Sequence, residues 1–287
     1  MINVTKDILK TIYKERPLEA KKYDYGLLLV IGGSEFYSGS PALSALAGLR
    51  AGADMAYVIA PRRAADIIAS FSPDLAAYPL EGKCLEGKHL STLISMTESA
   101  KIVSHGKTAV VIGGGAGRSE ETKKVIKEYL SQISIPAVID ADAIHAIADY
   151  QELISKKQFL ITPHSFEFFI LTGKEIKDVS FDEKVKAVQE QAKILGCTIL
   201  LKGKTDIISD GKEVALSNTG SPYMSIGGTG DALAGVAGSI MAQGFDPFLA
   251  AQAAAFINGK AGELAAKTKK ESMLTTDLIE SLCKVLH

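Results

Sequence analysis

The chain has 287 residues, of which 47% are hydrophobic and 23% charged, as in an ordinary globular protein rather than a disordered one. Its formal net charge of −1 leaves no basic surplus for a phosphate backbone, so we expect no nucleic-acid partner. The cysteines Cys84, Cys197 and Cys283 have no metal-binding spacing, and the sequence shows neither a secretion leader nor the roughly 20 apolar residues that cross a bilayer. We therefore expect a cytoplasmic protein that makes no membrane contact.

Short apolar runs along the chain predict buried parallel strands, because they are hydrophobic on both faces. In chain order these runs are Gly26–Ile31, Ala56–Ala60, Thr108–Ile112, Pro136–Ile139, Phe159–Thr162 and Thr198–Leu201. Segments of helical period lie between them, for example at Pro41–Ala53, Ser119–Leu130 and Phe181–Leu195. This alternation predicts an α/β fold with a central, mostly parallel sheet and helices on both faces.

The pattern changes after the last of these strands. Asp206–Leu216 predicts a hairpin that turns at Asp210 and Gly211. Helices are expected at Asp231–Gln243, Pro247–Lys267 and Thr276–Leu286, and the first is so rich in Ala, Gly and Ser that it should pack closely on the sheet. Because no repeat or linker interrupts the chain, we expect residues 1–287 to form a single domain.

The residues that follow each strand are the candidate site, since ligands bind beyond the carboxyl ends of the strands in an open α/β sheet. Gly32–Pro41 is either a ligand loop or a plain turn in which Ser40 caps the next helix. Gly113–Arg118 offers backbone N–H groups to an anion, but the GxGxxG dinucleotide fingerprint is absent. Asp140 and Asp142 could hold Mg²⁺ through water or bind a substrate, unless Asp142 is a helix N-cap.

Two further strand ends carry polar residues. His164 would face the cleft at a helix start or have a structural role, and Glu167, one turn later, could take part in capping. Lys202 ends a buried strand, where a lysine is costly unless it leaves the core toward an anion. Phosphate is the natural partner for that lysine.

The most specific motif is GGTGD at Gly227–Asp231, directly before a helix. Glycines that open a helix leave N–H groups aimed at one point, and the helix dipole adds positive potential there. Asp231 would then be a general base beside a transferring phosphoryl group, or a carboxylate that only supports the helix end. The dipole should keep Asp231 ionised at neutral pH.

Six motifs in a fixed order, from Gly26 to about Ala266, resemble those of the ADP-dependent NAD(P)H-hydrate dehydratases, a ribokinase-like family. The motifs are VIGGSEFYSGSP, VIGGGAG, VIDADAI, LITPHSFEFFILTG, ILLKGKTDII and NTGSPYMSIGGTGDALAG. The chain departs from the family's usual residues at Ser40 (usually Ala), at Gly113–Gly117 (usually GPGLG) and at Asn258 (usually His). We expect the family's separate epimerase domain to be absent, since the chain is too short to hold both.

The resemblance implies a ribokinase-like fold and a role for each matching residue. Asp231 would be the catalytic carboxylate. The nucleotide, ADP or ATP with Mg²⁺, would be bound by Lys202, Gly203, Lys204, Thr205, Asn218, Gly220, Gly227, Gly228, Thr229 and Gly230. The substrate, hydrated NADH or NADPH, would be bound by Gly33, Ser40, Gly115, His164 and Asp231. Family members are often tetramers, so the resemblance also implies a homo-oligomer, and no residue is expected to be a direct metal ligand.

Two other functions stay open on the sequence. A ribokinase-like kinase for a small alcohol, such as a sugar or a vitamin precursor, would use the same Asp231 and the same glycine-rich helix start. A nucleotide sensor without turnover would bind the nucleotide and leave Asp231 dispensable.

Overall fold

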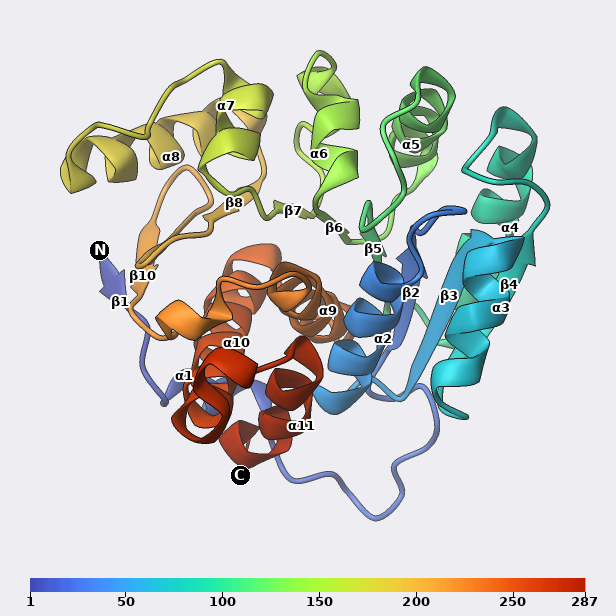
Figure 1. Ribbon diagram of the computed structural model, residues 1–287, viewed down its shortest axis with the longest axis horizontal. Coiled ribbons are helices and arrows are strands. Elements are labelled where there is room, and N and C mark those ends of the chain that lie inside the picture. The colour runs from blue at the N-terminus through green and yellow to red at the C-terminus, as the bar shows by residue number, and fades with distance from the viewer. Residues whose placement is uncertain (287) are drawn as a thin grey trace.

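The computed structural model describes residues 1–286, and within them ten strands form one sheet (Figure 1). In sheet order the strands are β1 (Ile2–Asn3), β10 (Val214–Ser217), β9 (Asp206–Ser209), β8 (Thr198–Leu201), β7 (Phe159–Ile161), β6 (Ala137–Ile139), β5 (Thr108–Ile112), β2 (Leu27–Ile31), β3 (Met55–Pro61) and β4 (Ala76–Leu80). Neighbouring strands run parallel, apart from β9, which is antiparallel to both β8 and β10.

Helices cover both faces of the sheet, as the sequence predicts (Figure 1). One face carries α1 (Ile8–Ile12), α2 (Gly39–Arg50), α3 (Arg62–Phe71), α9 (Thr229–Ala242), α10 (Pro247–Lys269) and α11 (Thr275–Leu286). The other face carries α4 (Leu90–Val103), α5 (Glu120–Gln132), α6 (Asp142–Ile147), α7 (Ser165–Thr172) and α8 (Phe181–Leu195). Short 3₁₀ turns lie at Gly87–His89, Gln151–Leu153, Pro222–Met224 and Lys270–Ser272. The predicted fold class is confirmed.

Strand β2 shows why the central strands are apolar throughout. Leu28 and Val30 point into the core under α2 and α9, whereas Leu27, Leu29 and Ile31 point into the core under α4 and α5. Each of the five is at most 2% exposed, so neither face of the strand reaches water. A two-sided core therefore requires the continuous apolar runs from which the sheet was predicted.

Helix α9 lies close against both the sheet and α2. A Cβ added at Gly235 would lie 2.0 Å from the Ser44 carbonyl oxygen of α2, and one at Gly238 would lie 2.5 Å from Cγ2 of Val111 in β5. Only glycine allows such an approach. The close packing expected from the small residues of this helix is confirmed, and it fixes the position of the N-terminus of α9.

The hairpin is confirmed, with β9 and β10 joined by a turn in which the Asp210 carboxylate accepts the N–H groups of Lys212 and Glu213. Strand β4 and helices α3 and α4 were not predicted. The strand lies at the edge of the sheet, contains Pro79 and is partly exposed, so it lacks the apolar pattern of a buried strand. Helices α2 and α9 both begin two residues before the predicted starts at Pro41 and Asp231.

The order of the strands reverses beside β2, because β3 lies on one side of it and β5 on the other. The loops that leave β2 and β5 therefore diverge at the same edge of the sheet, which is where an open α/β sheet binds its ligands. Throughout residues 1–286, no helix is both long and apolar enough to cross a membrane.

Candidate functional site

The N-terminus of α9 is built from glycines. Gly228 precedes the helix with a φ of +100°, and a Cβ added there would lie 2.6 Å from Cδ1 of Leu43 and 2.9 Å from Oγ1 of Thr275. No side chain of the described residues caps this end. The first N–H groups of α9 are thus available to a ligand, and Asp231 lies in the first turn beside them.

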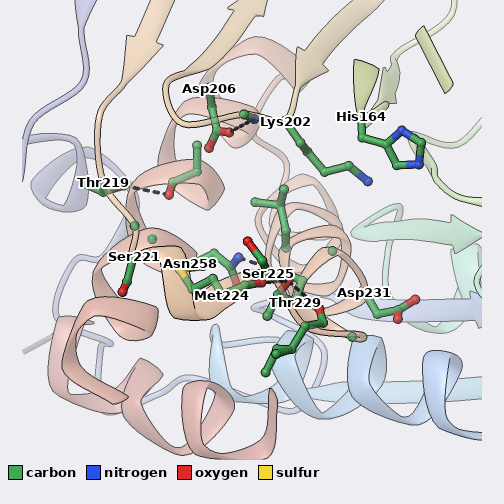
Figure 2. A pocket seen from close by; sticks show the side chains of 18 of the residues that line it. His164, Lys202, Asp206, Thr219, Ser221, Met224, Ser225, Thr229, Asp231 and Asn258 are labelled. Atoms are coloured by element: carbon green, nitrogen blue, oxygen red, sulfur yellow. Dashed lines mark hydrogen bonds between the residues drawn. The ribbon is translucent and has the colours of Figure 1, made fainter. Parts of the chain in front are cut away.

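A cavity of about 1030 Å³ opens in front of this helix end (Figure 2). Most of the predicted site residues line it, namely Ser40, His164, Lys202, Gly203, Lys204, Asn218, Gly220, Gly228, Thr229, Gly230 and Asp231. Gly33, Gly115, Thr205 and Gly227 are not among its lining residues. Strands far apart in the sequence therefore bring the predicted nucleotide and substrate residues to one cavity, while their individual roles stay predictions.

Two of the expected substrate glycines hold loops together instead of facing the cavity. The N–H of Gly33 donates to the carbonyl of Gly114 at 2.9 Å, and Tyr37 covers Gly115, where an added Cβ would lie 2.9 Å from the Tyr37 Cβ. Gly114 is the glycine that meets Asp231, since its added Cβ would lie 2.8 Å from Oδ1 of that carboxylate. Gly33 and Gly115 thus shape the loops beside Asp231, and their predicted contact with substrate stays a prediction.

Thr205 and Gly227 are each occupied by a protein partner. The Thr205 hydroxyl donates to Oδ1 of Asn218 at 2.7 Å, and the Gly227 carbonyl accepts the Thr275 hydroxyl at 2.7 Å. The second bond ties the glycine loop to α11. Both residues support the cavity wall from behind.

Ser40 lies inside the first turn of α2, which begins at Gly39, so the alternative that Ser40 caps this helix is wrong. Its side chain lies beside the Asp231 carboxyl, where it acts to lower the pKa of that group. The N-terminus of α2 and the N-terminus of α9 therefore meet at the carboxylate.

Asp231 is the perturbed acid of the site. Burial, with the like charge of Asp140 adding to it, raises the pKa of Asp231 to about 7, although the Ser40 hydroxyl and Lys202 act to lower it. The expectation that the helix dipole keeps this carboxyl fully ionised at neutral pH is wrong, because desolvation outweighs the charges that favour ionisation. A carboxyl with a pKa near neutrality is well matched to proton transfer at that pH.

Lys202 lies among carboxylates. Its Nζ is 3.0 Å from Oδ1 of Asp140 and 3.7 Å from Oε2 of Glu167, and both acids are nearly inaccessible to solvent. Burial alone would lower the pKa of Lys202, but these two carboxylates outweigh it and hold the pKa above its usual value. The side chain does leave the core toward anions, as predicted, and in the free protein those anions are Asp140 and Glu167.

His164 has the structural role left open on the sequence and also lines the cavity, while its contact with substrate stays a prediction. Its Nδ1 accepts the N–H groups of Phe166 and Glu167, and the Glu167 carboxylate accepts the His164 N–H, which makes a capping box at the start of α7. The Nε2 atom lies 3.5 Å from Oε1 of Glu167, and the side chain is 52% exposed and lines the cavity. Capping therefore fixes a ring that is still accessible from the cavity.

Asp142 is not an N-cap but the first residue of α6. Its carboxylate accepts the Gly117 N–H at 2.8 Å and Nε of Arg118 at 2.6 Å, so it fixes the glycine loop after β5 and is not free to bind Mg²⁺. Among the residues that the structure describes, no group of three or more His, Cys, Asp and Glu side chains is placed to hold a metal ion.

The sequence analysis assigned no site role to several polar residues of the cavity, among them Asp206 and Asn258. Asp206 starts β9 and accepts the Gly203 N–H, and burial raises its pKa to about 6. Its place four residues after Lys202 in the KGKTD segment was a signal that could have been used. Asn258 lies in the cavity wall on α10 and is 5% exposed, and its only mark in the sequence was its departure from the family's usual His.

Comparisons with known proteins agree with this geometry. The family model described as NAD(P)H-hydrate dehydratase matches residues 28–284. The bifunctional NAD(P)H-hydrate repair enzyme Nnr of Pyrobaculum aerophilum is 42% identical over 95% of this chain, and the chain spans about half (52%) of that relative's length. The ADP-dependent (S)-NAD(P)H-hydrate dehydratase of Nitrosopumilus maritimus is 33% identical over 99% of this chain and 96% of its own.

Solved structures share the fold. A ribokinase-like superfamily protein from Enterococcus faecalis V583 superposes with a TM-score of 0.84 at 26% identity, over 99% of this chain and 95% of its own. An ADP/ATP-dependent NAD(P)H-hydrate dehydratase from Bacillus subtilis, co-crystallised with ATP and Mg²⁺, gives a TM-score of 0.81 at 22% identity, over 99% of this chain and 97% of its own. The ribokinase-like fold is thereby confirmed.

Proposed function

Since this chain belongs to the NAD(P)H-hydrate dehydratase family, we propose that it performs the ADP-dependent dehydration of hydrated NADH or NADPH, giving NAD(P)H, AMP and phosphate. The observation that carries the proposal is Asp231, a carboxyl with a pKa near neutrality beside the open N-terminus of α9. A proton acceptor and an anion site lie side by side there, as the activation of a hydroxyl by phosphoryl transfer requires.

The chemistry follows from these two parts. Asp231 takes the proton from the hydroxyl of the hydrated nicotinamide ring while the β-phosphoryl group of ADP passes to that oxygen, which releases AMP. Phosphate is a far better leaving group than hydroxide. The ring nitrogen expels it, and a proton leaves the adjacent ring carbon to restore the dihydronicotinamide. N–H groups of Gly228–Gly230 would stabilise the charge on the transferring phosphoryl group.

The charges of the cavity favour a nucleotide that arrives with Mg²⁺. Two lysines, Lys202 and Lys204, line the cavity together with three acids, Asp140, Asp206 and Asp231, so there is no surplus of cations to balance the phosphates. The absence of a preformed metal cage in the described residues fits Mg²⁺, which is commonly bound through phosphates and one or two carboxylates. Asp140, which lines the cavity, would hold the ion through water, and the ion would neutralise charge on the phosphates.

The cavity divides into two halves in this proposal. Lys202–Lys204, Asn218, Gly220 and Gly228–Gly230 surround the nucleotide, and Ser40 and His164 face the hydrated ring. Thr205 and Gly227 support the nucleotide half, and Gly33 and Gly115 shape the loops of the substrate half. We further propose that residues 1–287 act as one domain, in a homo-oligomer such as a tetramer, in the cytoplasm. Sedimentation equilibrium tests the oligomeric state.

The decisive assay adds hydrated NADH and ADP or ATP with Mg²⁺ to the protein and follows the absorbance of the dihydronicotinamide. We expect the absorbance to return with one AMP formed per NADH when ADP is used. Asp231→Asn should slow the reaction by about 10²- to 10⁴-fold, the usual contribution of a general base. Asp182→Asn, an exposed first-turn acid of α8, is the matched control and should leave the rate unchanged.

A kinase would give a different result. If the protein transfers phosphate to an alcohol such as hydroxyethylthiazole or ribose, and ³¹P NMR shows a stable phosphate ester while hydrated NADH stays unchanged, the dehydratase proposal is wrong. Tight nucleotide binding without turnover of either kind would identify a sensor.

A further inference from the structure

Asn258 of α10 carries a buried acceptor that the protein does not use. The residue is 5% exposed and lines the cavity close to the first turn of α9 (Figure 2). Its Oδ1 is one of only two buried side-chain polar atoms in the described residues that lack a hydrogen-bond partner, the other being Nε2 of His145. An unpartnered buried oxygen is costly, so its presence in a cavity wall points to a partner from outside the chain.

The orientation of the Asn258 amide is fixed by its other end. Nδ2 donates to the carbonyl oxygen of Thr229 at 3.2 Å. A carbonyl can only accept, so rotating the amide by 180° would set two acceptor oxygens against each other and strand the NH₂ group. The oxygen, and not the nitrogen, is therefore the atom left for a ligand.

The ligand group that meets Oδ1 must be a donor. Phosphate oxygens are acceptors and are repelled by an amide oxygen, and they already have the open N–H groups of α9 and the cation of Lys202. Apolar side chains of Met224, Leu233 and Ala255 line the same cavity, as suits a flat base or a sugar carbon skeleton. The donors of a nucleoside are an exocyclic amine of the base and the ribose hydroxyls.

We propose that Oδ1 of Asn258 accepts a hydrogen bond from an N–H or O–H donor on the nucleoside part of the bound nucleotide and makes Asn258 a determinant of nucleotide specificity. The inference rests on the proposed nucleotide-binding function and deepens it. It also gives Asn258 a second task, because the same amide holds the first residue of α9 through Thr229.

Calorimetric titration tests the contact directly with four diphosphates. They are ADP, purine riboside diphosphate, which lacks the 6-amino group, 2′-deoxyADP and 3′-deoxyADP. Each is titrated with Mg²⁺ into the wild-type protein, Asn258→Ala and Gln252→Ala. Gln252 is the matched control, because it is a buried amide of the same helix whose Nε2 donates to the Phe248 carbonyl and which does not line the cavity. The titrations need no turnover. Their outcome can therefore contradict the role of Asn258 while the dehydratase assay succeeds, or support that role while the assay fails.

We expect one analogue to bind the wild type about 3- to 10-fold more weakly than ADP does, the usual effect of one lost hydrogen bond. In Asn258→Ala that difference in affinity should vanish, whereas in Gln252→Ala it should persist. Weaker binding of the purine riboside analogue identifies the 6-amino group as the donor. Weaker binding of a deoxy analogue identifies the ribose hydroxyl that this analogue lacks. Asn258→Ser, which cannot reach as far, replaces Asn258→Ala if that variant does not fold.

Two results overturn the proposal. The wild type binding all four diphosphates within about twofold of one another would show that Oδ1 meets no ligand donor. The other is an analogue that binds more weakly than ADP by the same factor in the wild type and in Asn258→Ala. That result would show that the missing donor contacts another residue and that Oδ1 meets only water.

Discussion

Replacing Asp231 with asparagine should stabilise the protein, and more so at alkaline than at acidic pH. The carboxyl has an ordinary pKa of 3.8 in the unfolded chain, and burial raises it to about 7 in the folded one. Between these two values the folded state binds more protons than the unfolded state does, so wild-type stability falls as the pH rises through that window. Asparagine keeps the shape of the side chain and removes the ionisation.

The size of the effect follows from the two pKa values. A change from 3.8 to about 7 corresponds to a folding cost of about 4 kcal/mol once the pH exceeds 7, at about 1.4 kcal/mol per pKa unit. Asp231 retains some solvent contact across the open cavity, and screening there reduces the gain to about 2–4 kcal/mol. At pH 5 the folded carboxyl is mostly protonated, so less than half of the gain should remain.

Urea unfolding at pH 5 and pH 8 measures the free energy of unfolding of the wild type and of Asp231→Asn at each pH. Asp182→Asn serves as the control, since its exposed carboxylate in the first turn of α8 loses little hydration on folding. A variant that is no more stable than the wild type at pH 8, or one whose gain is equal at the two pH values, would show that Asp231 is not destabilised by burial. The reasoning on its pKa would then fail, whatever the enzyme assay shows.

The other predictions concern the site. The kcat/KM of the wild type should fall as the pH drops through about 7, with the protonation of Asp231, and a pH-independent kcat/KM from pH 6 to 8 would contradict this. Gly114→Ala should abolish turnover with little change in nucleotide affinity, because the new Cβ would lie 2.8 Å from Oδ1 of Asp231 and displace that carboxyl. Rate assays measure the turnover, and titration measures the nucleotide affinity. Lys202→Met should lower the free energy of unfolding in urea by about 3–5 kcal/mol, because it leaves Asp140 and Glu167 without their cation. A variant as stable as the wild type would refute the pairing. His164→Asn retains a good N-cap for α7 and should weaken substrate binding more than nucleotide binding, and the reverse order would refute the two-half cavity.

The sequence by itself determined the buried strands of the sheet, the presence of helices on both its faces and the start of the site, but not the edge strands β1 and β4. Strands buried on both faces must be continuously apolar, which is why the ends of β5 and β8 were predicted to the residue. The GGTGD motif can also be interpreted without the tertiary structure, since glycines that open a helix expose N–H groups wherever that helix packs. Asp231 in a first helical turn followed from the motif alone.

Only the tertiary structure decided which charges meet. The pairing of Lys202 with Asp140 and Glu167 joins the ends of β8 and β6 to the first turn of α7, and the pKa of Asp231 depends on burial that no local pattern records. The same holds for Gly114, which gives the Asp231 carboxyl room, and for Asn258, whose unpartnered buried oxygen could not be foreseen without the packing around it. Desolvation and long-range contacts are properties of the packed chain, and they set the chemistry of the site.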